Sequence, residues 1–212
     1  MAVAALVPKN AHVIDVGTDH AMLPVYLAQT GGAEHIWASD LREGPLRSAS
    51  RLVEEMGTGD RVGLRLTDGL QGFTRTDGDT VVIAGMGGET MVSILSGAEW
   101  IRDNVLLILE PQSKQAVLRR WLTDSGFCIQ SERLVQDAGR IYPIMTATAG
   151  KAPVYTEAEY HTGLLAQIGM DPLFSKYLRS LQKRADTAAP YDREMQLLAD
   201  AYRKMEGEIG RT

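Results

Sequence analysis

The sequence predicts an α/β fold, with a mainly parallel sheet followed by a helical hairpin. Up to residue 122, short apolar runs alternate with segments of helical periodicity, a pattern typical of parallel sheets. Glycines or acids follow most of these runs, as they do at the ligand-binding edge of such sheets. Beyond Pro153 the strand signals stop, and apolar residues recur at alternating steps of three and four, which predicts helices that pack along a seam.

Composition and charge restrict the class of protein. The chain has 212 residues, of which 44% are hydrophobic and 23% charged, as expected for one main globular domain with a small appendage. A net charge of −5 excludes a general nucleic-acid coat, so any contact with nucleic acid must use a local basic patch.

The sequence also predicts where the protein works. The single cysteine, Cys128, excludes a disulfide framework and argues against a cysteine metal cluster. No apolar run approaches the length of a membrane span, and residues 1–6 carry no basic leader. We therefore expect a cytoplasmic protein and a monomer, without membrane or metal partners.

Residues 13–20 carry the first ligand signal. Their sequence, V-I-D-V-G-T-D-H, predicts a buried strand, a sharp turn at the glycine and a following helix. Thr18 and His20 stand where a dinucleotide-binding loop has glycines, so a pyrophosphate is a poor fit. S-adenosylmethionine has no pyrophosphate, and Asp15 or Asp19 can accept a hydrogen bond from its α-amino group. The alternative is that Asp15 only caps the helix.

Acidic residues also follow the next two predicted strands. Residues 35–39 predict a strand that ends at Asp40, where an acid usually accepts hydrogen bonds from the ribose hydroxyls of an adenosine; a solvated turn is the alternative. Residues 62–66 predict a strand followed by Asp68, which either accepts the amino hydrogens of adenine or makes a plain Asp-Gly turn. The predicted cofactor-binding residues are therefore Asp15, Gly17, Thr18, Asp19, His20, Asp40, Leu41, Asp68 and Gly69.

A glycine-rich segment follows the most apolar run. Residues 80–84 predict a central strand of a parallel sheet, and four residues follow it: Gly85, Met86, Gly87 and Gly88. Three glycines in four positions either leave the backbone open to a large flat group or only make a turn. With Asp19, these four residues form the predicted catalytic pocket for a target base. No general base is assigned, because a capping or core role for His20 competes with a role in proton transfer.

The next segments complete the predicted sheet. Residues 105–109 predict a fifth strand, with the polar segment 110–112 at its end and Ser113 as the cap of the next helix. Residues 128–134 and 141–147 predict a closing antiparallel pair, because no helical segment separates them.

A helical hairpin is predicted after the sheet. The segment G-K-A-P at 150–153 marks a boundary, so we expect a sheet domain over 1–150 and an antiparallel, coiled-coil-like hairpin over 151–212, broken at Pro190. The seam residues are Phe174, Leu178, Leu181, Ala185, Met195, Leu198, Tyr202, Met205 and Ile209. A basic stripe on the first helix either binds RNA phosphates or only solvates that helix, and its members are Lys176, Arg179, Lys183 and Arg184.

With these motifs in place, the chain resembles the bacterial tRNA adenine-N1 methyltransferases that act on adenine 22. The similarity covers about the whole chain, and its most specific parts are the strings I-A-G-M-G-G at 83–88 and D-V-G-T-D-H at 15–20. The resemblance implies a class I methyltransferase (Rossmann-like) fold with seven strands, S-adenosylmethionine as methyl donor and tRNA as substrate.

The chain departs from that family at two places. The family tends to have Gln-Pro-Asn where this chain has Glu110, Pro111 and Gln112, at the corner expected to face the target base. Family members also usually carry a longer N-terminal helix, with a basic residue before the position of Leu6.

Three other functions stay open on the sequence. A nicotinamide-dependent oxidoreductase would also use Asp40, although the first loop lacks the glycine pattern. A small-molecule methyltransferase can use the hairpin as a lid. A non-catalytic RNA-binding protein can retain the same sheet.

Overall fold

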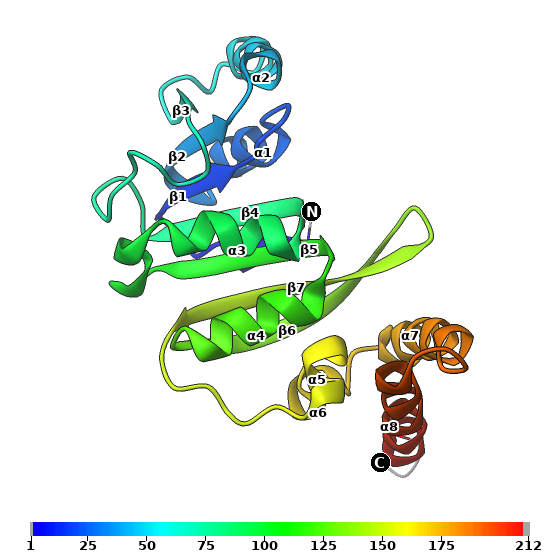
Figure 1. Cartoon of the computed structure of the whole chain (residues 1–212). Coiled ribbons are helices and arrows are strands. Elements are labelled where there is room, and N and C mark those ends of the chain that lie inside the picture. Colours follow the sequence, from blue (N-terminus) through cyan, green and yellow to red (C-terminus); the bar gives the residue numbers. More distant parts are fainter. Residues whose placement is uncertain (1, 210–212) are drawn as a thin grey trace.

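The structure is a computed structural model that describes residues 2–209, apart from the side chain of Ile209, which lies outside the described part. Seven strands form one sheet in the order β3-β2-β1-β4-β5-β7-β6 (Figure 1). Neighbours from β3 to β5 run parallel, whereas β7 runs antiparallel to both β5 and β6. The predicted seven-stranded α/β fold is therefore confirmed. The strands are β1 (Ala11–Val16), β2 (Ala33–Asp40), β3 (Val62–Leu66), β4 (Thr80–Gly87), β5 (Leu106–Ser113), β6 (Phe127–Asp137) and β7 (Arg140–Ala149).

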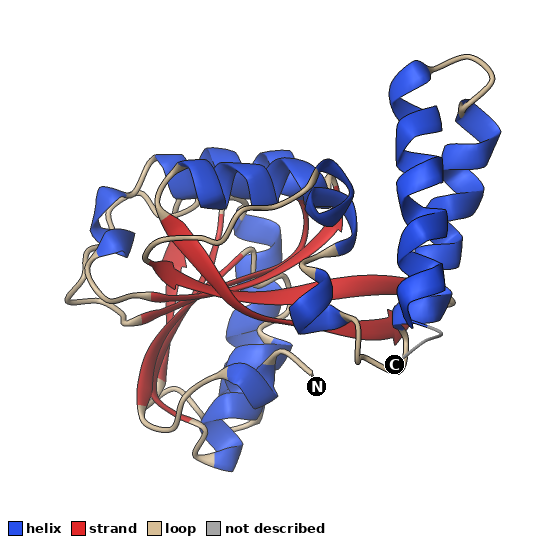
Figure 2. Ribbon diagram, turned by 90° about the horizontal axis from the view of Figure 1, so that it is seen from below, coloured by secondary structure: helices blue, strands red, loops and turns tan. Residues whose placement is uncertain are grey.

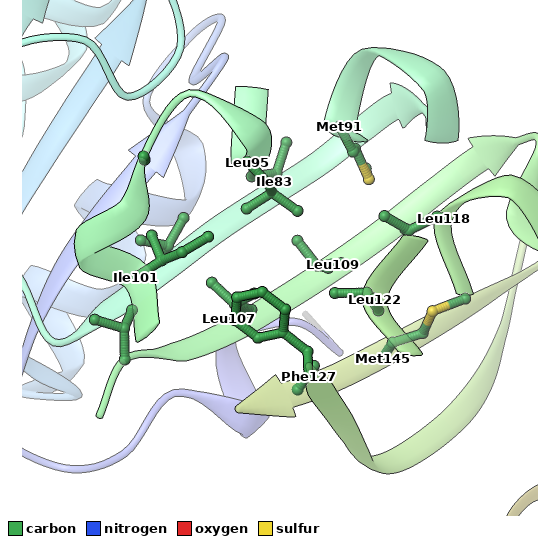
Figure 3. Close-up of a cluster of buried hydrophobic side chains, with 14 of the residues drawn as sticks. Ile83, Met91, Leu95, Ile101, Leu107, Leu109, Leu118, Leu122, Phe127 and Met145 are labelled. Carbon is green, nitrogen blue, oxygen red and sulfur yellow. The ribbon is translucent and has the colours of Figure 1, made fainter. Parts of the chain in front are cut away.

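Helices cover both faces of this sheet. Successive strand side chains point to opposite faces, so Ile83 of β4 joins one core and its neighbour Val82 joins the other. Figure 3 shows the first core, in which Ile83, Leu107 and Leu109 of the sheet pack against side chains of α3 and α4. The sheet-covering helices are α1 (Met22–Thr30), α2 (Glu43–Glu55), α3 (Gly88–Ser96) and α4 (Gln115–Asp124), with short 3-10 helices at Ala4–Leu6 and Glu99–Arg102.

Two central strands are longer than the sequence predicted. β4 continues through Gly87 and β5 continues through Ser113, so the two polar segments that follow the apolar runs lie side by side as strand. The prediction that Ser113 caps α4 is wrong: Ser113 pairs with Gly87, and Lys114, with φ at +56°, stands at the N-cap without a side-chain cap. Backbone pairing between the two segments thus replaces the expected loop.

The C-terminal region is helical, as predicted. α7 (Phe174–Ala188) and α8 (Arg193–Ile209) stand side by side at one end of the sheet (Figure 2). Their core contains predicted seam residues from both helices, among them Phe174, Leu178, Ala185, Leu198, Tyr202 and Met205. Two short helices before the hairpin were not predicted: α5 (Glu157–Thr162) and α6 (Leu165–Ile168). No helix in the described residues is long and apolar enough to cross a membrane.

A buried ion pair joins the hairpin region to the sheet. Arg119 of α4 is fully buried and binds Glu132 of β6, with 2.8 Å between Nη2 and Oε2. Its Nη1 also donates to the carbonyls of Tyr160 and His161 in α5, at 2.8 and 3.0 Å. Tyr155 and Tyr160 pack into the sheet core, so packing is continuous across residue 150 and the proposed domain boundary there stays a prediction.

Candidate active site

The first loop is fixed by the strand beside it. The backbone N–H groups of Gly17 and Thr18 both donate to the carbonyl of Ser39 in β2, at 2.8 and 2.9 Å. Gly17 has a φ of +75°, and a Cβ there would come within 2.1 Å of the terminal methyl of Met86. The left-handed backbone favours glycine at this position, and the flexible end of Met86 covers it. The loop therefore brings the predicted cofactor segment against the predicted target-base segment.

Two buried polar groups lie on this loop. Asp15 is 5% exposed, and burial raises the pKa of its carboxyl to about 6, although the nearby Thr18 hydroxyl lowers it. Thr18 Oγ1 is buried and makes no hydrogen bond of good geometry within the described residues. Buried polar groups in proteins are usually paired, so this loop fits a polar ligand that bonds to both. Asp19 and His20, by contrast, are exposed and lie 3.5 Å apart.

The end of β2 offers a second carboxylate. Asp40 is 7% exposed, and its Oδ1 accepts the backbone N–H of Arg42 at 2.9 Å. The Arg42 guanidinium reaches only to 3.6 Å from that oxygen. Leu41 beside it is 64% exposed, so an apolar surface stands next to a carboxylate, as an adenosine requires. Asp68 and Gly69 instead line a small cavity of about 90 Å³ against Ile94 of α3.

The three glycines after the apolar run differ in what they allow. A Cβ on Gly85, whose φ is +80°, would meet nothing closer than Gln112 Nε2 at 3.8 Å. At Gly87 it would stand 3.1 Å from Ser113 Oγ, and at Gly88 only 2.3 Å from the carbonyl oxygen of Lys114. Gly88 is thus required for packing against the next strand, while Gly85 borders open space where a flat group can approach.

A basic cleft runs from this corner to the hairpin. It has a volume of about 600 Å³, and its lining includes Gln112 and Ser113 of β5, Tyr142 of β7, and four basic residues: Lys114, Arg140, Lys176 and Arg184. No acidic residue of the described chain lines it. Two members of the predicted stripe therefore face the cleft. Arg179 instead lies 3.5 Å from Glu206 of α8, and Lys183 is exposed outside the cleft.

Lys114, Arg140 and Tyr142 were not predicted as site residues. Each is far from α7 in the sequence, and only the folded β6–β7 hairpin brings Arg140 and Tyr142 opposite that helix. Their chemistry gave a weak signal, since an arginine next to a turn is common on surfaces. Strand pairing across β5, β7 and β6 was needed to find them.

A group of possible metal ligands lies elsewhere. Atoms of Glu157, His161 and Glu194 come within 4.8 Å of one another where α5 meets α8. Both carboxylate oxygens of Glu157 already bind Arg120, at 2.6 and 2.8 Å. Burial also lowers the pKa of His161. The ion pair with Arg120 therefore accounts for Glu157.

Comparisons with known proteins support one family. A family model described as a methyltransferase domain matches residues 1–145. The tRNA (adenine(22)-N(1))-methyltransferase of Bacillus subtilis is 33% identical over 149 residues, which make up 70% of this chain and 63% of that protein. The chain thus spans about 63% of the length of the curated relatives it matches.

Solved structures match over nearly the whole chain. A Streptococcus pneumoniae protein proposed to be a tRNA (m1A22) methyltransferase is 32% identical, with a TM-score of 0.86 that covers 98% of this chain and 96% of that chain. A structure of the same description in complex with S-adenosyl-L-methionine is 34% identical, with a TM-score of 0.84 over the same shares. By its fold, its loop motifs and these matches, the chain belongs to the methyltransferase-domain family, together with the tRNA (adenine(22)-N(1))-methyltransferase of Bacillus subtilis.

Proposed function

We propose that this protein uses S-adenosylmethionine to methylate N1 of adenine 22 in tRNA. The observation that carries the proposal is the match to the Streptococcus pneumoniae complex, which extends over 98% of this chain and therefore includes the hairpin. A cofactor site alone would fit many methyltransferases. The addition of the hairpin and the basic cleft favours an RNA substrate over a small molecule.

The cofactor fits the acidic loop by its chemistry. Asp15 and the unpaired Thr18 hydroxyl suit the amino-acid end of the cofactor, because an ammonium group supplies the positive charge that a buried carboxylate lacks. Asp40 suits the ribose hydroxyls, and exposed Leu41 suits the face of the adenine. Asp68 and Gly69 remain candidates for contacts with the edge of the cofactor's adenine. When bound, S-adenosylmethionine supplies an electrophilic methyl group on a positively charged sulfur.

The reaction requires the protein to align the two reactants rather than to supply a general base. N1 of adenine has a lone pair in the ring plane, so it can attack without prior loss of a proton. Alignment of two reactants contributes on the order of 7–11 kcal/mol. The target base must leave its stack, at a cost of about a few kcal/mol, and the open wall at Gly85 offers room for it.

The basic cleft supplies the RNA contacts of the proposal. Lys114, Arg140, Lys176 and Arg184 surround a cavity that begins beside Gln112 and Ser113, at the target-base corner. Phosphates next to the flipped nucleotide can reach these cations while the base lies at Gly85. Positive charge that follows a groove is the usual feature of such binding. As part of the same proposal, the protein acts in the cytoplasm, as a monomer and without a metal ion.

A methylation assay tests the function directly. Purified protein is incubated with S-adenosylmethionine labelled in its methyl group and a tRNA transcript that has adenine at position 22. We expect label in the tRNA and a reverse-transcription stop at that position, since a methyl on N1 blocks base pairing. The matched control is the same transcript with guanine at position 22, which should stay unlabelled. Cofactor binding without any transfer to tRNA would point to a small-molecule methyltransferase, and RNA binding without cofactor binding to a non-catalytic protein.

A further inference from the structure

Glu110 occupies a particular place at the target-base corner. It pairs with Ala84 in the β4–β5 register, directly before an irregularity in that register. Gly85 is the residue that the pairing skips, and its backbone N–H lies near enough to the Glu110 carboxylate to lower the pKa of that group. The side chain thus lies at the point where the two central strands border the open space beside Gly85.

The charge of Glu110 is not balanced by the protein. Burial raises the pKa of its half-buried carboxyl, and the negative charge of Asp137 raises it further, while the Gly85 N–H lowers it. No lysine or arginine in the described residues forms an ion pair with it. A positively charged group that binds beside Gly85 would supply what this carboxylate lacks.

The proposed reaction creates such a group at this place. A bond forms between N1 of adenine and the methyl carbon, and the carbon–sulfur bond breaks with its electron pair staying on sulfur. Positive charge therefore moves from the sulfur to the base, and no proton is transferred in this step. The charge spreads over the ring to the exocyclic amino group, which becomes a stronger hydrogen-bond donor.

From this placement we infer that Glu110 accepts a hydrogen bond from the exocyclic amino group of the target adenine and stabilises the positive charge of the methylated base. The inference rests on the proposed function. A contact that strengthens as the charge develops lowers the barrier, because it binds the transition state better than the neutral base. It also gives specificity: guanine has a carbonyl oxygen where adenine has its amino group, and that oxygen is repelled by a carboxylate.

The first experiment compares two carboxylates. Glu110→Gln keeps the shape of the side chain and removes its charge, and Asp137→Asn is the matched control, since Asp137 is a nearby acid on the exposed end of β6. Single-turnover rates are measured with wild-type tRNA, and calorimetry gives affinities for S-adenosylmethionine and S-adenosylhomocysteine. We expect the Glu110→Gln rate to fall about ten- to a hundredfold, as for loss of a charged hydrogen bond. Both affinities and the Asp137→Asn rate should stay near wild type.

The second experiment removes the exocyclic amino group of the target base, which is the other partner in the proposed hydrogen bond. A ligated tRNA carries purine riboside, which lacks the amino group, at the target position. Wild-type protein should methylate it more slowly than adenine, because both the contact and some nucleophilicity of N1 are lost. The variant should show a smaller penalty, because its contact is already lost and only the lower nucleophilicity of the purine N1 remains. This arm uses wild-type protein, so it remains informative if Glu110→Gln does not fold.

The outcomes separate this inference from the function it rests on. No transfer by wild-type protein to any tRNA overturns both. A normal transfer rate in Glu110→Gln overturns only the role of Glu110. A rate loss on purine riboside that is as large in this variant as in wild type does the same. Weaker binding of S-adenosylmethionine but not of S-adenosylhomocysteine also overturns it, since the carboxylate would then pair with the sulfonium rather than with the base.

Discussion

The two regions that meet at the carboxyl edge of the sheet carry opposite charges. Asp15, Asp40 and Glu110 lie buried or half-buried along β1, β2 and β5. The neighbouring cleft between the sheet and α7 has four cations and no acid among its described lining residues. The net charge of −5 is therefore unevenly distributed. Acids gather where the proposed ligands are cationic, and bases gather where RNA phosphates would lie.

The two regions also differ in how they use their charges. Two of the acids lie beside backbone N–H groups: Asp40 accepts the N–H of Arg42, and the N–H of Gly85 lies near the Glu110 carboxylate. The cleft cations Lys176 and Arg184 are exposed side chains on one helix. This difference suits fixed geometry for methyl transfer and adaptable contacts for RNA.

The largest expected effect is on the buried ion pair that connects the sheet with the helices after it. Arg119→Ala leaves Glu132 buried without a partner, so the free energy of unfolding should fall by about 3–5 kcal/mol. Urea denaturation measures it. The control is Arg120→Ala, which breaks the exposed pair with Glu157 and should cost about 1 kcal/mol or less. Equal losses of unfolding free energy in both variants would mean that the buried pair does not stabilise the fold more than the exposed pair does.

A pH experiment tests whether burial destabilises the ionised form of Asp15. Its folded pKa of about 6 lies above the ordinary 3.8, so the folded state binds its proton more tightly than the unfolded state. Stability of the cofactor-free protein should therefore fall as pH rises from about 4 through 6, by about 3 kcal/mol in all. Asp15→Asn should lose this pH dependence and be more stable at neutral pH. Parallel stability curves for the two proteins would show that Asp15 is not the cause.

A substitution at Asp40 tests whether the acidic region binds S-adenosylmethionine. Asp40→Ala removes the proposed ribose acceptor, and the affinity for S-adenosylmethionine should weaken by about 1–3 kcal/mol in calorimetry. Asp60→Ala, an exposed acid in the loop after α2, provides the control and should bind normally. Wild-type affinity in a folded Asp40→Ala protein would remove Asp40 from the site.

Local sequence patterns were enough to predict the fold and the residues at the strand ends. Each apolar run became a strand because its period and its flanking glycines agree with burial in a sheet, as at residues 80–84. The heptad spacing likewise predicted the packing of α7 on α8, because the seam depends only on steps along each helix. α5 was missed, although Thr156 and Glu159 form a capping box that the sequence contains.

The rest of the site depends on pairing between distant segments. The sequence places Lys176, Arg179, Lys183 and Arg184 on one helix, but whether a residue faces the cleft or α8 is decided by the position of β7 and Glu206. Likewise, Gly88 was expected to open a pocket, and the carbonyl of Lys114 turns it into a packing residue. Such contacts have no signature in local periodicity.

The matched cations on α7 provide the most direct test of the charge separation. Lys176→Ala with Arg184→Ala removes two charges from the cleft, and Arg179→Ala with Lys183→Ala removes two from outside it. tRNA affinity is measured against salt concentration for both variants and wild type, with cofactor affinity as the control for folding. The cleft variant should bind cofactor normally, bind tRNA weakly and lose about two units of salt slope, one for each phosphate contact. An unchanged slope in that variant, or an equal loss in the other, would contradict the assignment of RNA binding to the cleft.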